Sequence, residues 1–494
     1  MTTPVDQALP AEDGPAGLAK GAPTASAGGT PLVIKLLVAA TFVVILNETI
    51  MGNAIPRLMV DFEVSTRAAQ WLTTIFLLTM AAVIPITGWF LQRVTTRQAY
   101  GLAMAVFCTG TALCALAPVF EVLLAGRMVQ AAGTAVMMPL LMTTLMTVVP
   151  ESDRGRVMGN VTLAMSVAPA LGPAVSGVIL GLGSWRLIFL LVLPVAAVVA
   201  ILGLRQLPDI GEPTAGAVDW LSVCLAGTGF AALVYGLSEI GGDSAIVPTV
   251  AGLLGAVLVA CFVWRQLSLQ RTGTPLLDLR TLTHRTYVLS LLVMSVGFMA
   301  MLGAMILLPL YLQHARGLSA LRTGLLVMPG GLAMGVLGPR AGGWYDRFGS
   351  RPLVIPGAIA ILIGLGVLSQ IGTATPYAVL IAAHIVMMMG LAFVFTPVFT
   401  LGLGALPPHL YPHGSSILGT IQQVAGAVGT AAVVVIADIR SRQLLADGAA
   451  QVDAFVGGLR WAFLAGAVAA VAVVALAALL PARVERTEGA PAPH

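Results

Sequence analysis

The sequence predicts an all-α integral membrane protein with fourteen transmembrane helices. Of its 494 residues, 58% are hydrophobic and 9% are charged, whereas soluble domains carry about 25% charged residues. The mean hydropathy is +0.96, and apolar windows of about 20 residues, the length that a helix needs to cross a bilayer, recur along the chain. A ten-residue segment recurs at an offset of 254 residues, which indicates two related halves.

The apolar windows give the position and the direction of each helix. We expect helices at residues 32–54, 69–91, 98–118, 122–148, 157–181, 185–204, 218–238, 246–267, 286–312, 321–341, 353–371, 376–402, 415–437 and 457–480. An even number of helices places both termini on one side. If that side is the cytoplasm, cytoplasmic segments hold sixteen Lys and Arg residues and outer segments hold eight. Basic residues favour the cytoplasmic side, so we expect both termini there, with the outer segments "HARGLSALR" and "DIRSR" as exceptions.

Composition and motifs exclude several classes of function. The net charge of +4 is small and scattered, so nucleic acid is not an expected partner. The four cysteines lie in or beside apolar runs, which disfavours disulfides and metal sites. No phosphate-binding loop occurs, and the six histidines do not cluster with acids in any span. We therefore expect a protein that is not an enzyme, needs no cofactor or metal, and works as a monomer in the bilayer.

The internal repeat pairs "GWFLQRVTTR" at 88–97 with "GGWYDRFGSR" at 342–351. Both segments carry Gly first, an aromatic residue third, and Arg sixth and tenth. The offset spans eight predicted helices, so both segments lie on the same side of the membrane and the repeat is parallel. The predicted domains are a disordered cytoplasmic tail (1–31), a six-helix bundle (32–205), two inserted helices and a linker (206–285), a second six-helix bundle (286–481), and a second cytoplasmic tail (482–494).

Glu48 interrupts the first apolar run, within "ILNETIMGN". A carboxylate inside a bilayer costs several kcal/mol unless it is paired, hydrated or protonated. At about 1.5 Å per residue, Glu48 lies roughly 8 Å from the outer edge and Arg127 of the fourth helix roughly 9 Å from it. The two charges can pair if their helices face one cavity. The sequence leaves three roles open for Glu48: proton carrier, static salt bridge between helices, and ligand of a cationic substrate.

Gln130 follows Arg127 by one helical turn, so the two side chains should face the same way. Either they line a cavity and tune the acid, or Arg127 extends toward the outer interface and supports packing. His384 stands alone among apolar residues, and we expect a hydrogen-bonded core histidine there, with titration during a working cycle as the alternative.

Several segments resemble motifs of the major facilitator superfamily in the same order and topology. The segment at 342–351 resembles the loop between helices two and three that marks this superfamily. "RMVQAAGTA" (127–135) resembles its fourth-helix motif, and "LGPAVSG" (171–177) resembles the fifth-helix motif associated with antiporters. "LNETIMGNAIP" (46–56), "SWRLIFLLVLP" and "YGLSEIG" are similar to segments of the fourteen-helix drug:proton antiporter branch. The resemblance covers about residues 32 to 480.

Two departures from the usual motifs resemble the subgroup related to lincomycin-efflux proteins. The first-helix pattern has Asp one position before Glu48, where this chain has Asn47. The first cytoplasmic loop has Gln92 and Thr95 where the pattern has Asp and Gly. The resemblance implies proton-coupled efflux of amphipathic, drug-like compounds by alternating access in a bacterial plasma membrane. Export of an endogenous lipid or secondary metabolite is the alternative, and proton symport is less consistent with the fifth-helix motif.

Four groups of residues are the expected sites. Proton coupling is expected at Glu48 and Arg127. The substrate cavity is expected at Asn47, Glu48, Asn53, Gln130 and Met137. The antiporter motif, which would bend the fifth helix and close an outer gate unless it only packs, comprises Pro169, Gly172, Pro173 and Gly177. The cytoplasmic latch, with solvated helix ends as its alternative, comprises Gln92, Arg93, Arg97, Asp346, Arg347, Gly349 and Arg351.

Overall fold

A computed structural model describes residues 30–211, 213, 216, 218–239, 246–271 and 275–483, without the side chains of Asn53, Thr66, Arg67, Pro173, Ala174 and Ala320. The predicted tails, apart from residues 30, 31, 482 and 483, lie outside this part of the chain. Within it, all regular secondary structure is helical. Fourteen helices are long and apolar enough to cross a membrane, as predicted.

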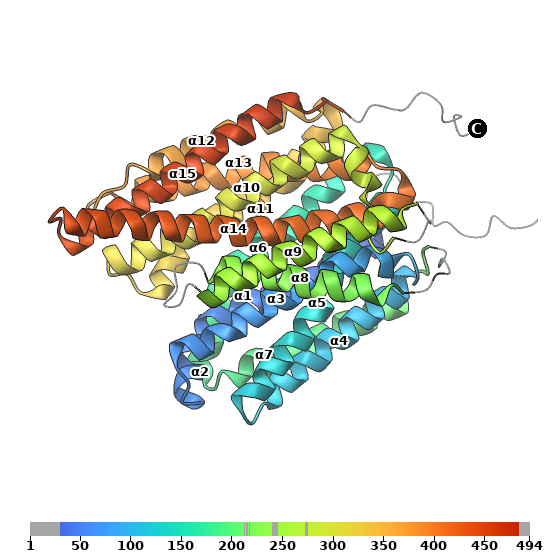
Figure 1. The fold of residues 1–494 in the computed structure, drawn as a ribbon, viewed down its shortest axis with the longest axis horizontal. Helices are drawn as coiled ribbons and strands as arrows, with labels where there is room; N and C mark the ends of the chain where they lie inside the picture. The colour runs from blue at the N-terminus through green and yellow to red at the C-terminus, as the bar shows by residue number, and fades with distance from the viewer. Residues whose placement is uncertain are drawn as a thin grey trace, which may run out of the picture.

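The helices form two six-helix bundles with a helix pair between them in sequence (Figure 1). The first bundle contains α1 (Leu32–Ile50), α3 (Thr66–Leu91), α4 (Thr96–Leu116), α5 (Phe120–Val148), α6 (Arg154–Leu182) and α7 (Arg186–Gln206). The inserted pair is α8 (Trp220–Ser238) and α9 (Ile246–Leu269). The second bundle contains α10 (Arg285–Leu310), α11 (Ala320–Phe348), α12 (Arg351–Leu368), α13 (Tyr377–Gly404), α14 (Tyr411–Ala446) and α15 (Gln451–Leu479).

Several helices extend beyond their predicted limits, among them α11, which continues to Phe348, past the predicted end at residue 341. After α1 the chain stays helical through η1 (Met51–Ala54) and α2 (Ile55–Asp61). Residues 411–414, which precede the predicted helix 415–437, already belong to α14, because Pro412 occupies the first turn, where proline is tolerated. At its other end, α14 continues past the apolar residues, and an ion pair of 2.9 Å joins Asp438 to Arg442 one turn later.

The two bundles meet through a glycine seam between α6 and α11. A Cβ atom at Gly342 would meet the carbonyl oxygen of Gly155, and one at Gly159 would meet that of Gly338. Both helices therefore carry two glycines four residues apart, a spacing that lets helix backbones approach closely in membranes. Farther along α11, Gly331 lies against α6 at about the middle of that helix.

The second contact between the bundles uses hydroxyl groups. The hydroxyls of Thr143 and Ser415 lie 3.0 Å apart, and Ser416 of α14 bonds to both the carbonyl oxygen of Ile84 and the hydroxyl of Thr87 on α3. In the described part of the chain, every hydrogen bond between the bundles lies in the half of the molecule that holds residues 30 and 483. In Figure 1 the blue and the red bundles converge toward that end.

The inserted pair packs on the outside of this junction. Helix α8 contacts both α3 and α14, and α9 packs on α8. The side chain of Gln266 donates to Ser222 and accepts hydrogen bonds from the backbone amides at 276 and 277, so it anchors the linker. The Arg265 guanidinium beside Asp219 holds the pKa of that carboxyl at about 2, below its usual range.

The glycine seam generates a stability prediction. Gly342→Val should lower the free energy of unfolding by about 1–3 kcal/mol, because the new side chain overlaps the backbone of Gly155. Gly343→Val is the matched control, since a Cβ atom there has open space. Thermal unfolding of the purified variants checks this, and equal melting temperatures would show that the helices do not pack this closely.

Candidate functional site

Arg127 lies on α5 and is almost completely buried, with 1% of its surface exposed. Its Nε donates to the carbonyl oxygen of Leu72 on α3 at 3.4 Å, and its guanidinium lies 4.2 Å from the ring centre of Phe76. Its Nη1 donates to the side-chain oxygen of Gln130 at 3.0 Å. The side chain therefore turns into the bundle and does not extend to the outer interface, the alternative considered for it.

Gln130 continues this polar chain to a third helix. Its Nε2 donates to the hydroxyl of Thr111 on α4 at 2.8 Å, and that hydroxyl donates to the carbonyl oxygen of Phe107 at 2.7 Å. The approach of α4 and α5 depends on Gly110, where a Cβ atom would overlap the backbone of Gln130. A chain of hydrogen bonds thus joins α3, α4 and α5 around one buried cation, and each link offsets the cost of burial.

Glu48 of α1 interacts electrostatically with Arg127, as its predicted depth suggested. No direct ion pair joins the two side chains in the described residues, because the Arg127 hydrogen bonds go to Leu72 and Gln130. The neighbouring residue, Asn47, is 1% exposed, and neither polar atom of its side chain has a hydrogen-bond partner in the described part of the chain. The site thus places an acid near the buried cation, beside an amide that is unsatisfied within the described residues.

The other residues expected to line a substrate cavity do not share one site in the described part of the chain. Met137 is buried in the hydrophobic core of the molecule. The side chain of Asn53 lies outside the described residues. Asn47, Gln130 and Met137 do not line the groove described below.

The antiporter motif lies on α6, which runs without interruption through Pro169. Gly172 packs against Thr49 of α1, and the hydroxyl of Ser176 donates to the carbonyl oxygen of Ile50 at 2.9 Å. Gly177 faces open space, and the side chain of Pro173 is outside the described residues. In this conformation the motif forms a seam with α1 inside the first bundle.

Asp346 bridges the two bundles. Its carboxylate accepts hydrogen bonds from the backbone amides of Gly155 at 2.9 Å and Arg156 at 2.8 Å. These amides belong to the first turn of α6, where no side chain of the same helix caps them. A carboxylate at a helix N-terminus satisfies free N–H groups and is stabilised by the helix dipole. The expected latch residue Asp346 thus contacts helix backbone across the two bundles.

The other latch residues of the second half fasten the α11–α12 junction to the end of α15. Gly349 ends α11 with a φ of 82°, a conformation that favours glycine. Nε of Arg351 donates to the carbonyl oxygen of Leu480 at 2.8 Å, and Arg483 donates to the carbonyl oxygen of Arg347 at 2.7 Å. These contacts lie within the second bundle.

The first half has a weaker version of the bridge. The side-chain nitrogen of Gln92 donates to the carbonyl oxygen of His409 at 3.1 Å, just before α14. Arg93 lies over the ring of Trp89 at 4.2 Å, and Arg97 is exposed in the first turn of α4. Gln92 carries no charge, so it cannot attract a helix N-terminus as Asp346 does.

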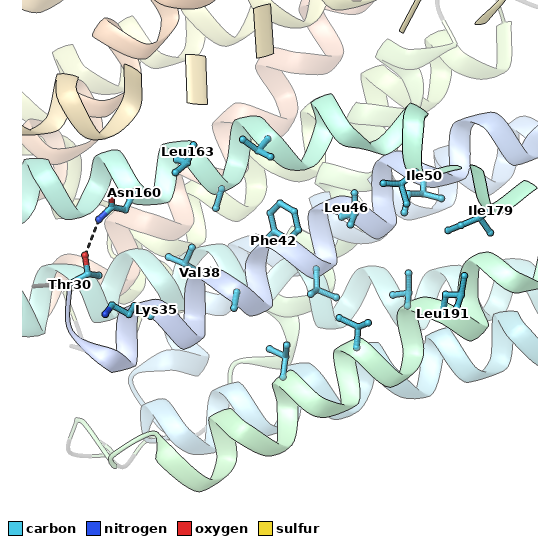
Figure 2. A pocket seen from close by; sticks show the side chains of 18 residues that line it. Thr30, Lys35, Val38, Phe42, Leu46, Ile50, Asn160, Leu163, Ile179 and Leu191 are labelled. Atoms are coloured by element: carbon cyan, nitrogen blue, oxygen red, sulfur yellow. Dashed lines mark hydrogen bonds between the residues drawn. The ribbon is translucent and has the colours of Figure 1, made fainter. Parts of the chain in front are cut away.

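Sequence reasoning missed the glycine seam and a groove of about 940 Å³ between α1, α6 and α7 (Figure 2). The spacing of four between Gly155 and Gly159, and again between Gly338 and Gly342, was a readable signal for the seam. The groove has no such signal, because its walls are apolar like the rest of the membrane surface. His384, expected to be a core histidine, is buried against Gly330 of α11, beside the backbone of Val327.

Comparison with known proteins adds sequence relatives to this geometry. The family model of the Major Facilitator Superfamily matches residues 37–430. The chain is 38% identical over 442 residues to the uncharacterized MFS-type transporter YcnB of Bacillus subtilis, covering 89% of this chain and 92% of that one. It is 37% identical over 408 residues to the lincomycin resistance protein LmrB of Listeria innocua, covering 82% and 86%. A multidrug resistance protein B homolog of Mycobacterium tuberculosis is 29% identical over 393 residues, covering 78% and 72%.

Solved structures share the fold at low sequence identity. The proton:xylose symporter XylE has a TM-score of 0.64 at 15% identity, covering 91% of this chain and 95% of that one. The human organic anion transporter MFSD10 has the same TM-score and identity, covering 91% and 100%.

The polar chain around Arg127 generates a second prediction. Gln130→Leu leaves a buried guanidinium N–H without its acceptor, so the free energy of unfolding should fall by about 2–3 kcal/mol. Met128→Leu, at a half-exposed position on the same helix, should have little effect. Thermal unfolding measures both, and an unchanged Gln130→Leu variant would mean that the chain contributes nothing to stability.

The Asp346 bridge generates a third. Asp346→Asn removes the charge and one of two acceptor oxygens. The closed conformation should therefore lose about 1–2 kcal/mol of stability relative to the open one. The fraction of molecules that are open at this end should rise roughly tenfold. Spin labels at Arg205 and Phe348, in a cysteine-free background, would report this as a larger population of long distances. Asp153→Asn is the control, because Asp153 pairs with Arg156 inside the first bundle at 3.2 Å. Identical distance distributions for the two variants would exclude a latch.

Proposed function

Since this chain belongs to the Major Facilitator Superfamily, we propose that it exports amphipathic, drug-like compounds in exchange for protons. It is a multi-pass membrane transporter and not an enzyme. The names of its relatives support drug export, because proteins named for lincomycin and multidrug resistance align with most of the chain. We place it in the bacterial plasma membrane as a monomer, with both termini in the cytoplasm on the count of basic residues.

The observation that carries proton coupling is the arrangement of Glu48 and Arg127. The two charges interact without a direct ion pair, while Arg127 is held by Leu72 and Gln130. Glu48 is therefore free to take and release a proton without dismantling the hydrogen bonds of the cation. Protonation removes the attraction between α1 and α5, and deprotonation restores it.

A path leads from Glu48 to the junction of the bundles. Thr49, next to Glu48, packs against Gly172 of α6, and the end of α1 accepts a hydrogen bond from Ser176. The same helix α6 carries the seam and the amides that Asp346 binds. A change in the position of α1 on protonation can therefore bias the contact between α6 and α11.

The place where the bundles touch supports alternating access. The hydrogen bonds between them in the described residues lie at the end that holds the termini. With cytoplasmic termini, this conformation is closed toward the cytoplasm and corresponds to the outward-facing state. Return to the inward-facing state requires release of Asp346 and separation of the glycine seam.

Drug export and export of an endogenous compound differ only in the substrate. Export of an endogenous lipid or secondary metabolite would use the same coupling, and Glu48 could bind a cationic substrate directly. Symport is the less favoured direction, because the fifth-helix motif is associated with antiporters.

The test is transport in proteoliposomes with an imposed proton gradient, using cationic dyes and lincosamide-like compounds. Glu48→Gln should reduce gradient-driven transport at least roughly tenfold, because a neutral amide cannot carry a proton. Binding and substrate exchange without a gradient should persist. Glu121→Gln, which changes an exposed acid in the first turn of α5, is the matched control.

The outcomes distinguish the roles of Glu48. Loss of binding for cationic compounds, with uncharged compounds still bound, would assign Glu48 to substrate recognition. Normal gradient-driven transport by Glu48→Gln would contradict proton coupling at this residue. Transport of every compound by wild type, independent of the gradient, would contradict antiport altogether.

A further inference from the structure

The groove between α1, α6 and α7 runs along the face of α1 opposite to the one that carries Glu48. Its α1 wall extends from Lys35 to Ile50, which is about 22 Å along a helix. Apart from its ends, the lining is hydrocarbon, as Figure 2 shows for Val38, Phe42 and Leu46. The volume of about 940 Å³ is within the usual range for sites that hold small organic molecules.

The groove opens sideways toward the membrane. Leu191 and Val195 of α7 line it and are 46% and 53% exposed, so one wall is continuous with the lipid-facing surface. Nothing polar lies along this opening that would favour water. An apolar trough that opens into the bilayer at this depth suits an acyl chain.

One end of the groove is polar and basic. Thr30, Lys35 and Asn160 lie together there (Figure 2), and the Asn160 side chain donates to the Thr30 hydroxyl at 2.8 Å. A second cavity of about 610 Å³ continues from this end, since Thr30, Asn160 and Leu163 line both. It adds Arg156 and Arg340. Three cations thus surround the polar end, and no acidic residue of the described part of the chain lines either cavity, although Arg156 also pairs with Asp153 at 3.2 Å.

These observations combine an acyl-sized trough with a cluster of cations at the membrane surface. We propose that the groove binds one anionic phospholipid from the leaflet at the termini, with its phosphate among Lys35, Arg156 and Arg340. In the orientation proposed above, this is the cytoplasmic leaflet. Basic pockets between membrane helices on that side recognise anionic headgroups, and each Lys or Arg adds roughly a fivefold gain in affinity.

The headgroup site exists only where the two bundles touch. Lys35 and Arg156 belong to the first bundle, and Arg340 belongs to α11 of the second. Arg156 also supplies one of the backbone amides that Asp346 binds. A phosphate at this position joins the bundles beside the latch, so the lipid binds the conformation that is closed at this end.

The test uses phosphatidylglycerol with a photoreactive group on one acyl chain, in phosphatidylcholine vesicles that hold the full-length protein. Mass spectrometry of the labelled peptides should place the adducts on α1, α6 and α7. Unlabelled phosphatidylglycerol should suppress the labelling at least roughly tenfold better than phosphatidylcholine. Inorganic phosphate and glycerol phosphate should not suppress it, because neither fills the apolar trough.

Two pairs of variants test the headgroup site and the acyl-chain groove separately. Lys35→Gln with Arg340→Gln should reduce labelling by about 25-fold, whereas Arg205→Gln with Arg271→Gln removes two basic residues elsewhere and should not. Ala39→Trp fills the trough from an exposed position and should also abolish labelling, with Val198→Trp on the outer face of α7 as its control.

Three results would overturn the proposal. Labelling spread evenly over all lipid-facing helices, or unaffected by the double variant, would mean that the groove holds bulk lipid. Equal competition by phosphatidylcholine would make the basic end irrelevant. Suppression by a transported drug, with no preference among lipids, would reassign the groove to the substrate.

Discussion

The close backbone contact between α6 and α11 holds the observed conformation together. Two pairs of glycines remove the side chains that would keep the helices apart, and Asp346 then reaches the free amides at the start of α6. The second feature depends on the first, because the carboxylate reaches those amides only when the helices approach closely. The orientation of the two bundles, and hence the side on which they separate, follows from this contact.

The buried cation imposes a second constraint. Burying a guanidinium inside a membrane protein is costly, and two of the five donors of Arg127 bond to one backbone carbonyl and one amide side chain on neighbouring helices. These bonds hold the cation in place, and the acid of α1 acts on it electrostatically. In the cycle proposed above, this division separates the structural role of Arg127 from the charge of Glu48, so that the acid changes its protonation state while the bundle stays intact.

Much of this arrangement could be predicted from the sequence, and the exceptions have physical causes. Fourteen helices and the parallel repeat follow from hydropathy and from one duplicated segment, and the similar depth of Glu48 and Arg127 follows from their positions along the helices. The rotation of each helix about its axis could not be predicted, because nearly all faces of these helices are apolar. Gln130, for example, was expected to line a cavity, but its side chain bonds to α4. The partner of Asp346 was equally hidden, because backbone amides leave no mark in a sequence. The start of α14 was missed because Pro412 reads as a loop residue as well as a first-turn residue.

The two pseudo-symmetric junctions are chemically unlike, and this has a mechanical consequence. Hydroxyl pairs between α3, α5 and α14 can each be exchanged for bonds to water one at a time, so that side can come apart gradually as water enters. The contact between α6 and α11 has the carboxylate of Asp346 and the amides it binds at one end, but along the glycines it offers water only backbone carbonyls. We infer that this end opens gradually on the side of the hydroxyls and abruptly on the side of the glycines.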